Sequence, residues 1–169
     1  SNVSHTAAAN GVSVVVGDGA LFSSPGPTRD GRQKPEIVAP GQVIGSTKSA
    51  GAIPGASIFR TTSILEGGAY AISQGTSMAT PHVSGVVALL LQELVKRGMG
   101  FDGIEVREAL QNTARTDSFT GTVPNNRWGY GKMDVDSLFM LLFGPPVPKK
   151  TTETVQNDTS SIAFQSPDG

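Results

Sequence analysis

Apolar positions fall into a few blocks along the chain, and each block predicts one structural element. The longest block runs from Ser77 to about Arg97 and is apolar nearly all round, which predicts a single buried helix. Gly85 and Ala88 in this block are small enough to let another element approach the helix closely. At 1.5 Å per residue, such a helix would be on the order of 30 Å long.

Shorter blocks predict strands and two further helices. Residues 12–17 and 37–39 are β-branched runs bounded by glycine or proline, so we expect both to be core strands. Residues 104–115 and 134–142 have apolar positions at helical spacing. The stretches between these blocks predict a charged turn and an edge hairpin, at residues 29–32 and 57–61.

Composition indicates a soluble globular domain followed by a tail. The chain has 169 residues, of which 37% are hydrophobic and 16% charged, enough for one core and too polar for a fibre. Residues 144–169 are rich in proline, serine, threonine and aspartate, so we expect a flexible tail or a linker there. The predicted division is therefore a folded part over residues 1–143 and a tail over residues 144–169.

Charge and cysteine content exclude several classes of protein. The net charge is −1 and basic residues are scattered, which does not favour binding to nucleic acid or to an anionic membrane. The apolar run from Val83 to Leu91 is shorter than the roughly 20 residues that span a bilayer, so no membrane segment is expected. The absence of cysteine excludes disulfides and thiol catalysis, and the dispersed acidic residues indicate no metal site.

The start of the long helix carries the main candidate chemistry. Gly75 allows a sharp bend just before the helix, so Ser77 would lie in the first turn. Backbone N–H groups there have no partner within the helix, and the helix dipole adds partial positive charge. Both features suit the oxyanion of an acyl-transfer reaction. The pattern also fits a simpler role, in which Thr76 or Ser77 caps the helix.

Residues 75–85, with the sequence GTSMATPHVSG, closely resemble the block around the nucleophile of the subtilisin-like serine proteases. Residues 22–41 and 128–135 resemble the segments before and after the nucleophile in that family, although Pro25 and Glu36 depart from its usual arginine and aspartate. The resemblance spans roughly residues 12–143. It implies a subtilisin-like α/β fold, with a mainly parallel sheet between layers of helices, of which this chain is the C-terminal part.

The resemblance also implies a reaction. Ser77 would attack the scissile carbonyl of a polypeptide substrate, and its backbone N–H would bind the oxyanion beside Gly75 and Thr76. Asn10, in a small-residue segment, is a weak candidate for a second oxyanion donor, and an Asn-Gly turn explains it equally well. Family members often bind calcium, but no residues here indicate a site, so no cofactor is predicted. An extracellular location is favoured by the resemblance alone.

The chain lacks an obvious partner for Ser77. A serine hydroxyl needs a base, which a third group orients. His82 lies five residues further along the same predicted helix and would point about 140° away from Ser77, so we expect a structural role for it. His5 lacks the His-Gly-Thr-His surroundings of the family's catalytic histidine, and the family's Asp-Ser-Gly or Asp-Thr-Gly tripeptide is absent.

The catalytic histidine and aspartate are therefore expected upstream of residue 1. The isolated chain should be inactive or nearly so, with the upstream half of the domain as its partner and self-association as another outcome. The alternative is a non-catalytic pseudoprotease that serves as a scaffold or binding module. An esterase-type hydrolase is disfavoured, since residues 75–79 break the Gly-x-Ser-x-Gly pattern.

Overall fold

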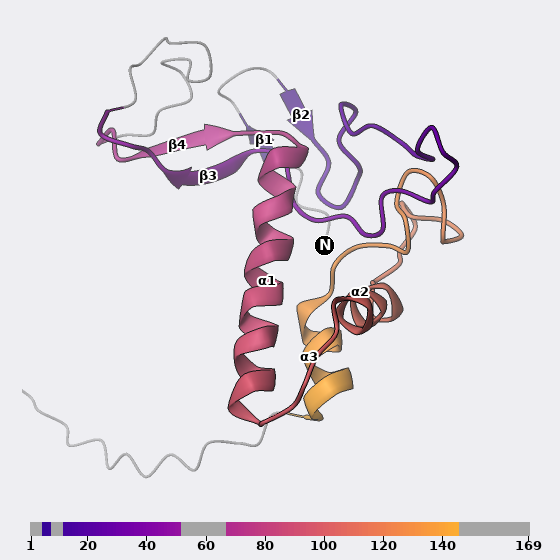
Figure 1. The fold of residues 1–169 in the computed structure, drawn as a ribbon. Coiled ribbons are helices and arrows are strands. Elements are labelled where there is room, and N and C mark those ends of the chain that lie inside the picture. Colours follow the sequence, from indigo (N-terminus) through magenta and orange to yellow (C-terminus); the bar gives the residue numbers. More distant parts are fainter. Residues whose placement is uncertain (1–4, 8–11, 52–66, 146–169) are drawn as a thin grey trace, which may run out of the picture.

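A computed structural model describes residues 5–7, 12–51 and 67–145 of the chain. Short strands and loops come first and three helices follow (Figure 1). In chain order, the elements are β1 (His5–Ala7), β2 (Val12–Val14), β3 (Ile44–Thr47), β4 (Tyr70–Ser73), α1 (Thr76–Lys96), α2 (Gly103–Asn112) and α3 (Val135–Phe143). The three predicted helices are all present, each with ends close to those expected.

Helix α1 is the axis of the fold, and α2 and α3 lie beside its C-terminal half (Figure 1). Leu90 and Leu94 of α1 are buried together with Ala109 and Leu110 of α2 and Leu138 of α3. Hydrophobic burial of this kind is worth about 1.5–3 kcal/mol for each large side chain. The three-helix cluster is therefore the main source of stability in the described part of the chain.

The prediction that α1 is buried on all sides is wrong for this chain. Its fully buried residues are Leu90 and Leu94, whereas Leu89 is 57% exposed and Val95 is 66% exposed. A Cβ added at Gly85 would meet no atom within 4 Å, so none of the described elements approaches the helix there. The reason is that α2 and α3 cover one side of α1 and leave another open.

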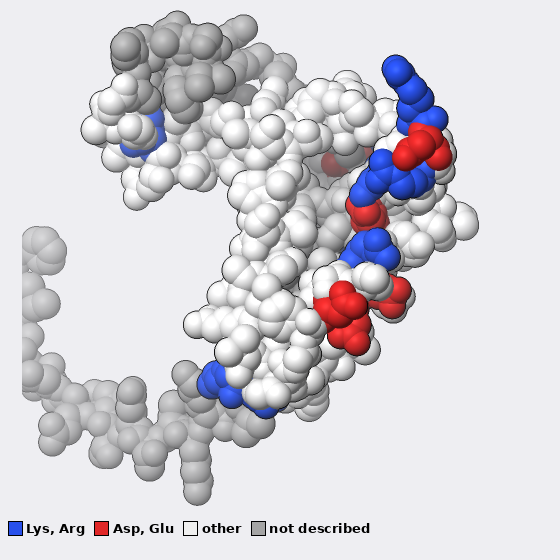
Figure 2. Space-filling model, in the orientation of Figure 1, with Lys and Arg blue, Asp and Glu red and all other residues white. Residues whose placement is uncertain are grey.

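The open side of α1 carries no charge. Residues 76–92 contain no aspartate, glutamate, lysine or arginine. In Figure 2 the surface along α1 is uncharged, and most charged side chains gather on the opposite edge of the molecule, with others at the end of the helix and beside the β3–β4 sheet. An apolar helix face without charge is typical of a surface that packs against other protein.

By length and composition, α1 also meets the requirements of a membrane-spanning helix. Its mean hydropathy reaches 1.3 over 18 residues, and 11% of that window is buried. This differs from the expectation based on Val83–Leu91, because the helix continues beyond that run in both directions. The central helix of a globular protein has the same properties.

The described strands form two small antiparallel sheets. β1 pairs with β2, and β3 pairs with β4 in a register that places Ile44 opposite Ser73. The expected core strand at residues 37–39 is represented by one parallel bridge, between Val38 and Lys132. Parallel sheets normally have both faces covered by other elements. Among the described residues, residues 37–39 have only this one bridge, so they do not form a regular strand there. The predicted hairpin at 57–61 lies outside the described residues.

Side chains at their first turns fix the two shorter helices. Asp102 and Glu105 form a capping box at the start of α2. The Asp134 carboxylate accepts a hydrogen bond of 3.0 Å from the backbone N–H of Ser137 at the start of α3. Caps of this kind contribute about 1 kcal/mol each. Gly144, with φ of 75°, ends α3 just after Phe143, where the sequence predicts the end of regular structure.

Lys132, in the segment between α2 and α3, contacts the loop that follows β2. Its ammonium group donates to the Asp117 carboxylate over 2.6 Å and to the backbone carbonyl of Gly17. The same nitrogen lies 4.9 Å from the ring centre of Trp128 and 5.2 Å from that of Phe119. Lys132 is only 9% exposed, so this group of contacts is sheltered from solvent.

Because of this ion pair, we expect the free energy of unfolding to vary with pH in the acid range. The hydrogen bond from Lys132 holds the pKa of Asp117 below its ordinary value, which is about 4 in an unfolded chain. A carboxyl with a lowered pKa stabilises the fold above its unfolded pKa, and this contribution disappears as the pH falls through the folded pKa. Urea unfolding should therefore show a free energy of unfolding that declines below about pH 4.

Asp117→Asn should make that acid decline shallower, because the substituted side chain does not titrate. Asp136→Asn, on the exposed surface of α3, is the matched control and should keep the wild-type slope. An unchanged slope in Asp117→Asn would show that the Lys132 contact does not contribute to the pH dependence.

Candidate active site

A glycine turn connects β4 to α1 and sets the position of Ser77. Gly75 has φ of 151° and ψ of 164°, a conformation that favours glycine, and its N–H donates to the carbonyl of Gly41 over 2.8 Å. The helix begins at Thr76, so Ser77 is its second residue. Its side chain is exposed.

The structure excludes the capping interpretation of this turn. The N-cap residue is Gly75, and no side chain caps the helix. The hydroxyl groups of Thr76 and Ser77 are therefore not used for that purpose. Within the described residues, the N–H of Met78 donates to the carbonyl of Gly75 over 3.0 Å, whereas the N–H groups of Thr76 and Ser77 make no backbone hydrogen bond and lie at the positive end of a 21-residue helix. This is the arrangement that an oxyanion requires.

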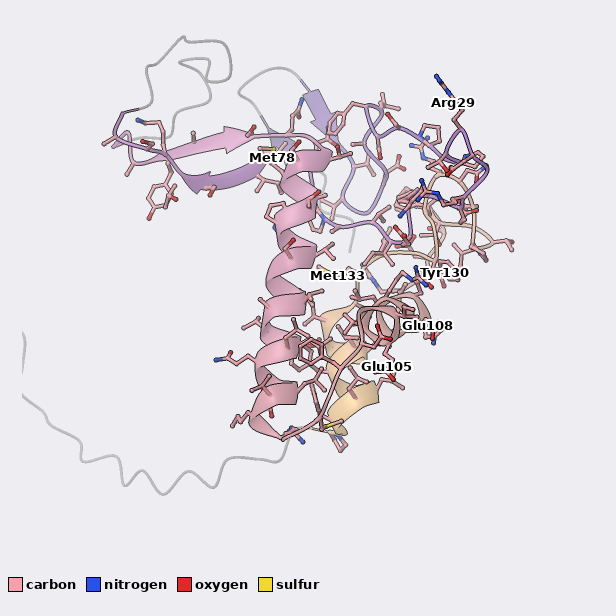
Figure 3. All side chains as sticks on the ribbon, viewed as in Figure 1. Arg29, Met78, Glu105, Glu108, Tyr130 and Met133 are labelled. Carbon is pink, nitrogen blue, oxygen red and sulfur yellow. The ribbon has the colours of Figure 1, made fainter. Side chains whose placement is uncertain are left out.

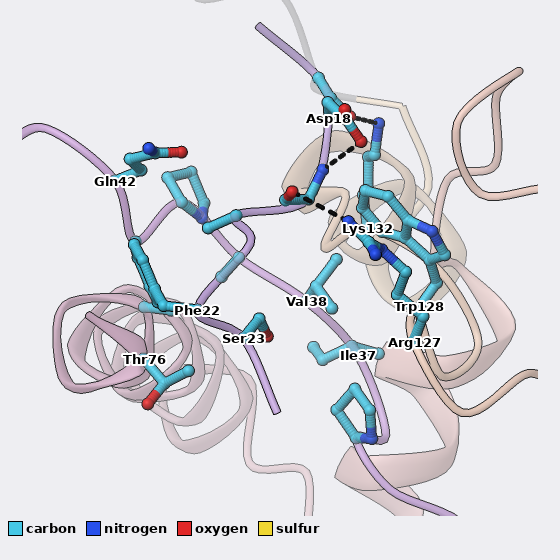
Figure 4. A pocket seen from close by; sticks show the side chains of 18 of the residues that line it. Asp18, Phe22, Ser23, Ile37, Val38, Gln42, Thr76, Arg127, Trp128 and Lys132 are labelled. Carbon is cyan, nitrogen blue, oxygen red and sulfur yellow. Dashed lines mark hydrogen bonds between the residues drawn. The ribbon is translucent and has the colours of Figure 1, made fainter. Parts of the chain in front are cut away.

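A cavity of about 600 Å³ lies beside the turn (Figure 4). Gly75 and Thr76 line it at the start of α1, and Ala79, Thr80 and Val83 extend that wall along the helix. Ser77 is not one of the lining residues. The cavity therefore borders Gly75 and Thr76, whereas the exposed Ser77 follows them in the chain and does not line it.

The opposite walls of the cavity are mainly apolar, and three basic residues also line it, Arg115, Arg127 and Lys132. Residues 15–24 and 35–42 supply most of these walls. Arg127 donates from Nη2 to the carbonyl of Gly19 over 3.1 Å, and Lys132 donates to that of Gly17 (Figure 4). Since Arg127 and Lys132 are both held by loop carbonyls, their structural role is to fix the loop that forms this wall.

No described histidine is a base for Ser77. The Nδ1 atom of His82 lies 2.8 Å from the carbonyl oxygen of Met78, one turn earlier on the same helix, which confirms the predicted structural role. His5 lies in β1, and nothing about its side chain is described. Asn10, the weak candidate for an oxyanion donor, lies outside the described residues.

The acidic residues of α2 are remote from this turn, whereas Asp18 lines the same cavity as Gly75 and Thr76. Figure 3 places Met78 at the start of α1, beside the β3–β4 sheet, whereas Glu105 and Glu108 lie on α2 at the other side of the molecule. Over residues 5–7, 12–51 and 67–145, no three histidine or acidic side chains gather closely enough to hold a metal ion.

Two residues next to the turn have no role that the sequence predicts. Gly41 accepts the hydrogen bond from Gly75, and Val43 has φ of 55°, rare for a β-branched residue. The Pro40-Gly41 dipeptide marks a turn in the sequence, but the segment that this turn contacts cannot be read from it.

Comparison with known proteins identifies the family. The model of the Subtilase family matches residues 3–131, which is most of the chain. The chain therefore belongs to the subtilase family, and its subtilisin-like α/β fold class is confirmed.

Individual relatives agree with this assignment. The chain is 38% identical over 119 residues to serine protease AprX of Bacillus subtilis, a match that covers 70% of the chain and 24% of AprX. It is 35% identical over 159 residues to the minor extracellular protease Vpr of the same species, covering 87% of the chain and 18% of Vpr. The solved structure of the Clostridium perfringens CspB protease matches with a TM-score of 0.57 and 30% identity, over 75% of this chain and 24% of that one.

The chain is much shorter than the proteins it matches. Across eight curated relatives, it spans between 4% and 32% of the relative's length. Most of each relative therefore has no counterpart among these 169 residues.

Proposed function

We propose that this chain is the nucleophile-bearing part of a serine endopeptidase that hydrolyses peptide bonds through an acyl-enzyme. Ser77 attacks the scissile carbonyl of a polypeptide, and its backbone N–H, in the first turn of α1, donates to the oxyanion. The observation that carries the proposal is the exposed Ser77 at the start of α1, directly after the glycine turn, within the segment that matches the subtilase family.

The base and the acid that orients it come from residues beyond this chain. Only His5 and His82 are available in the sequence, and His82 is bonded to its own helix. A serine hydroxyl without a base is a weak nucleophile at neutral pH. The short span of the chain relative to its relatives supports a longer protein that supplies both groups. No cofactor takes part in this reaction.

The uncharged face of α1 is the surface on which the rest of the catalytic domain packs. Leu89 is more than half exposed there and Gly85 is open, although both belong to a helix with the composition of a protein core. Burying that face would remove apolar area from water at about 25 cal/mol per Å². The name of the relative Vpr supports secretion of the longer protein.

A fluorophosphonate probe reacts with activated serines. It tests whether Ser77 is activated only when the longer protein supplies the base and the acid. Residues 1–169 alone should be labelled at least about 100-fold more slowly than the longer protein, because general-base catalysis contributes about 10²–10⁴-fold. The Ser77→Ala variant of each protein is the control for labelling at other sites.

Two outcomes would contradict parts of the proposal. Rapid labelling of the isolated chain that depends on Ser77 would show that the base lies within these 169 residues. A longer protein that is not labelled at all would favour the pseudoprotease instead.

A further inference from the structure

We propose that Gly41 is a positioning residue for the nucleophile, an inference that rests on the proposed function of Ser77. Gly41 belongs to the loop Pro40–Val43, which precedes β3. This loop is packed against the turn that presents Ser77, and it fixes the orientation of the peptide groups just before the helix.

The contact between the two segments is direct. The N–H of Gly75 donates to the carbonyl of Gly41 over 2.8 Å. Pairing of β3 with β4 places Ile44 opposite Ser73, so the loop before β3 and the turn after β4 lie at the same end of the sheet. The hydrogen bond thus fixes the peptide at Gly75, two residues before Ser77.

The interface leaves no room for a side chain at position 41. A Cβ there would lie 2.8 Å from the carbonyl oxygen of Gly75 and 3.2 Å from the Cβ of Ala79. Real Cβ atoms do not approach other atoms under 3.0 Å, so an added methyl would move the Gly75 carbonyl. Because Gly75 is the N-cap of α1, this movement would be passed to the first turn of the helix.

The backbone of Val43 provides a second, independent observation. Its φ of 55° is a conformation that β-branched residues rarely adopt. Backbone conformations of this kind persist where the surrounding structure determines them, and they cluster at functional sites. The loop is therefore held in one shape against its own local preference, as a rigid support for the turn would need to be.

Small displacements of a nucleophile have large kinetic effects. A misplacement of about 1 Å can lower the rate about 10²-fold, because the attacking atom and the oxyanion donors must both meet the substrate carbonyl. Gly41 itself does not react. A change at this position should therefore affect the chemical step more than substrate binding.

The test compares Gly41→Ala with Gly45→Ala in the longer protein. Gly45 lies in the adjacent strand β3, and a Cβ there would meet no atom within 4 Å, so it is the matched control. Peptide hydrolysis is measured per active site, titrated with a fluorophosphonate after long incubation. Gly41→Ala should lower kcat about 10²-fold with KM changed less than about threefold, whereas Gly45→Ala should keep both values.

Should Gly41→Ala fail to fold, the same methyl is added on an Ala79→Gly background. That change removes the Ala79 contact but leaves the one with the Gly75 carbonyl, and Ala79→Gly alone is the reference. A kcat per titrated site equal to that of the reference, or to that of Gly45→Ala, would overturn the role of Gly41. Failure of the proposed function itself is distinguishable, because Ser77→Ala would then retain full labelling and activity.

Discussion

Ser77→Ala in the longer protein should lower kcat for peptide hydrolysis by about 10⁶-fold, the size of the loss known for the nucleophile of the related enzyme subtilisin. The Ser77 hydroxyl oxygen forms the bond to the acyl group in the acyl-enzyme, and alanine has no atom that can form it. The expected change in KM is small, since the alanine side chain removes one exposed hydroxyl. Steady-state hydrolysis of a fluorogenic peptide measures both constants.

Ser84→Ala is the matched control for that loss. Ser84 is also exposed and lies about two turns further along α1, so it tests whether any serine-to-alanine change on this helix has the same effect. Its kcat should stay within about twofold of the wild-type value, because the hydroxyl that it removes lies outside the first turn of α1. Equal losses in the two variants would mean that the helix surface, rather than the Ser77 hydroxyl, is required.

Gly129→Ala should have the largest effect on stability. Gly129 has φ of 58°, and a Cβ there would overlap the carbonyl groups of Pro35 and Glu36. The strained backbone costs about 1–3 kcal/mol, and the overlap adds about as much again. Since domains are stable by about 5–15 kcal/mol, the variant should lose a large part of its folding free energy. Urea unfolding of the 169-residue chain measures the loss.

Gly121→Ala separates the two contributions. Gly121 has nearly the same φ, 61°, but a Cβ there would meet nothing within 4 Å. This variant should show the backbone cost alone, about 1–3 kcal/mol. Equal destabilisation of the two variants would mean that the close approach of Gly129 to residues 35–36 contributes nothing to the free energy of unfolding. The bridge between Val38 and Lys132 would then not depend on that approach.

The features that the sequence predicts well are local ones. The first residues of α1 and α3 follow from the glycine before Thr76 and from Asp134, which act within one helical turn. The place of Ser77 in the first turn of α1 could be predicted because its immediate neighbours determine the turn. The exposure of Ser77 follows from the same turn.

Features that depend on distant segments could not be predicted in this way. The burial of α1 depends on which elements cover it, and its apolar composition does not reveal that Leu89 is open to solvent. The contact between Gly41 and Gly75 joins two turns far apart in the sequence, and it is brought about by the pairing of β3 with β4. The positive φ of Val43 likewise has no signal in the sequence.

The most direct test of the account is to find which residue of the longer protein carries the fluorophosphonate adduct. Mass spectrometry of the digested, labelled protein identifies the modified peptide and the residue within it. The account predicts a single major adduct on Ser77, which is lost in Ser77→Ala. An adduct on a different serine, or labelling that persists in Ser77→Ala, would contradict it.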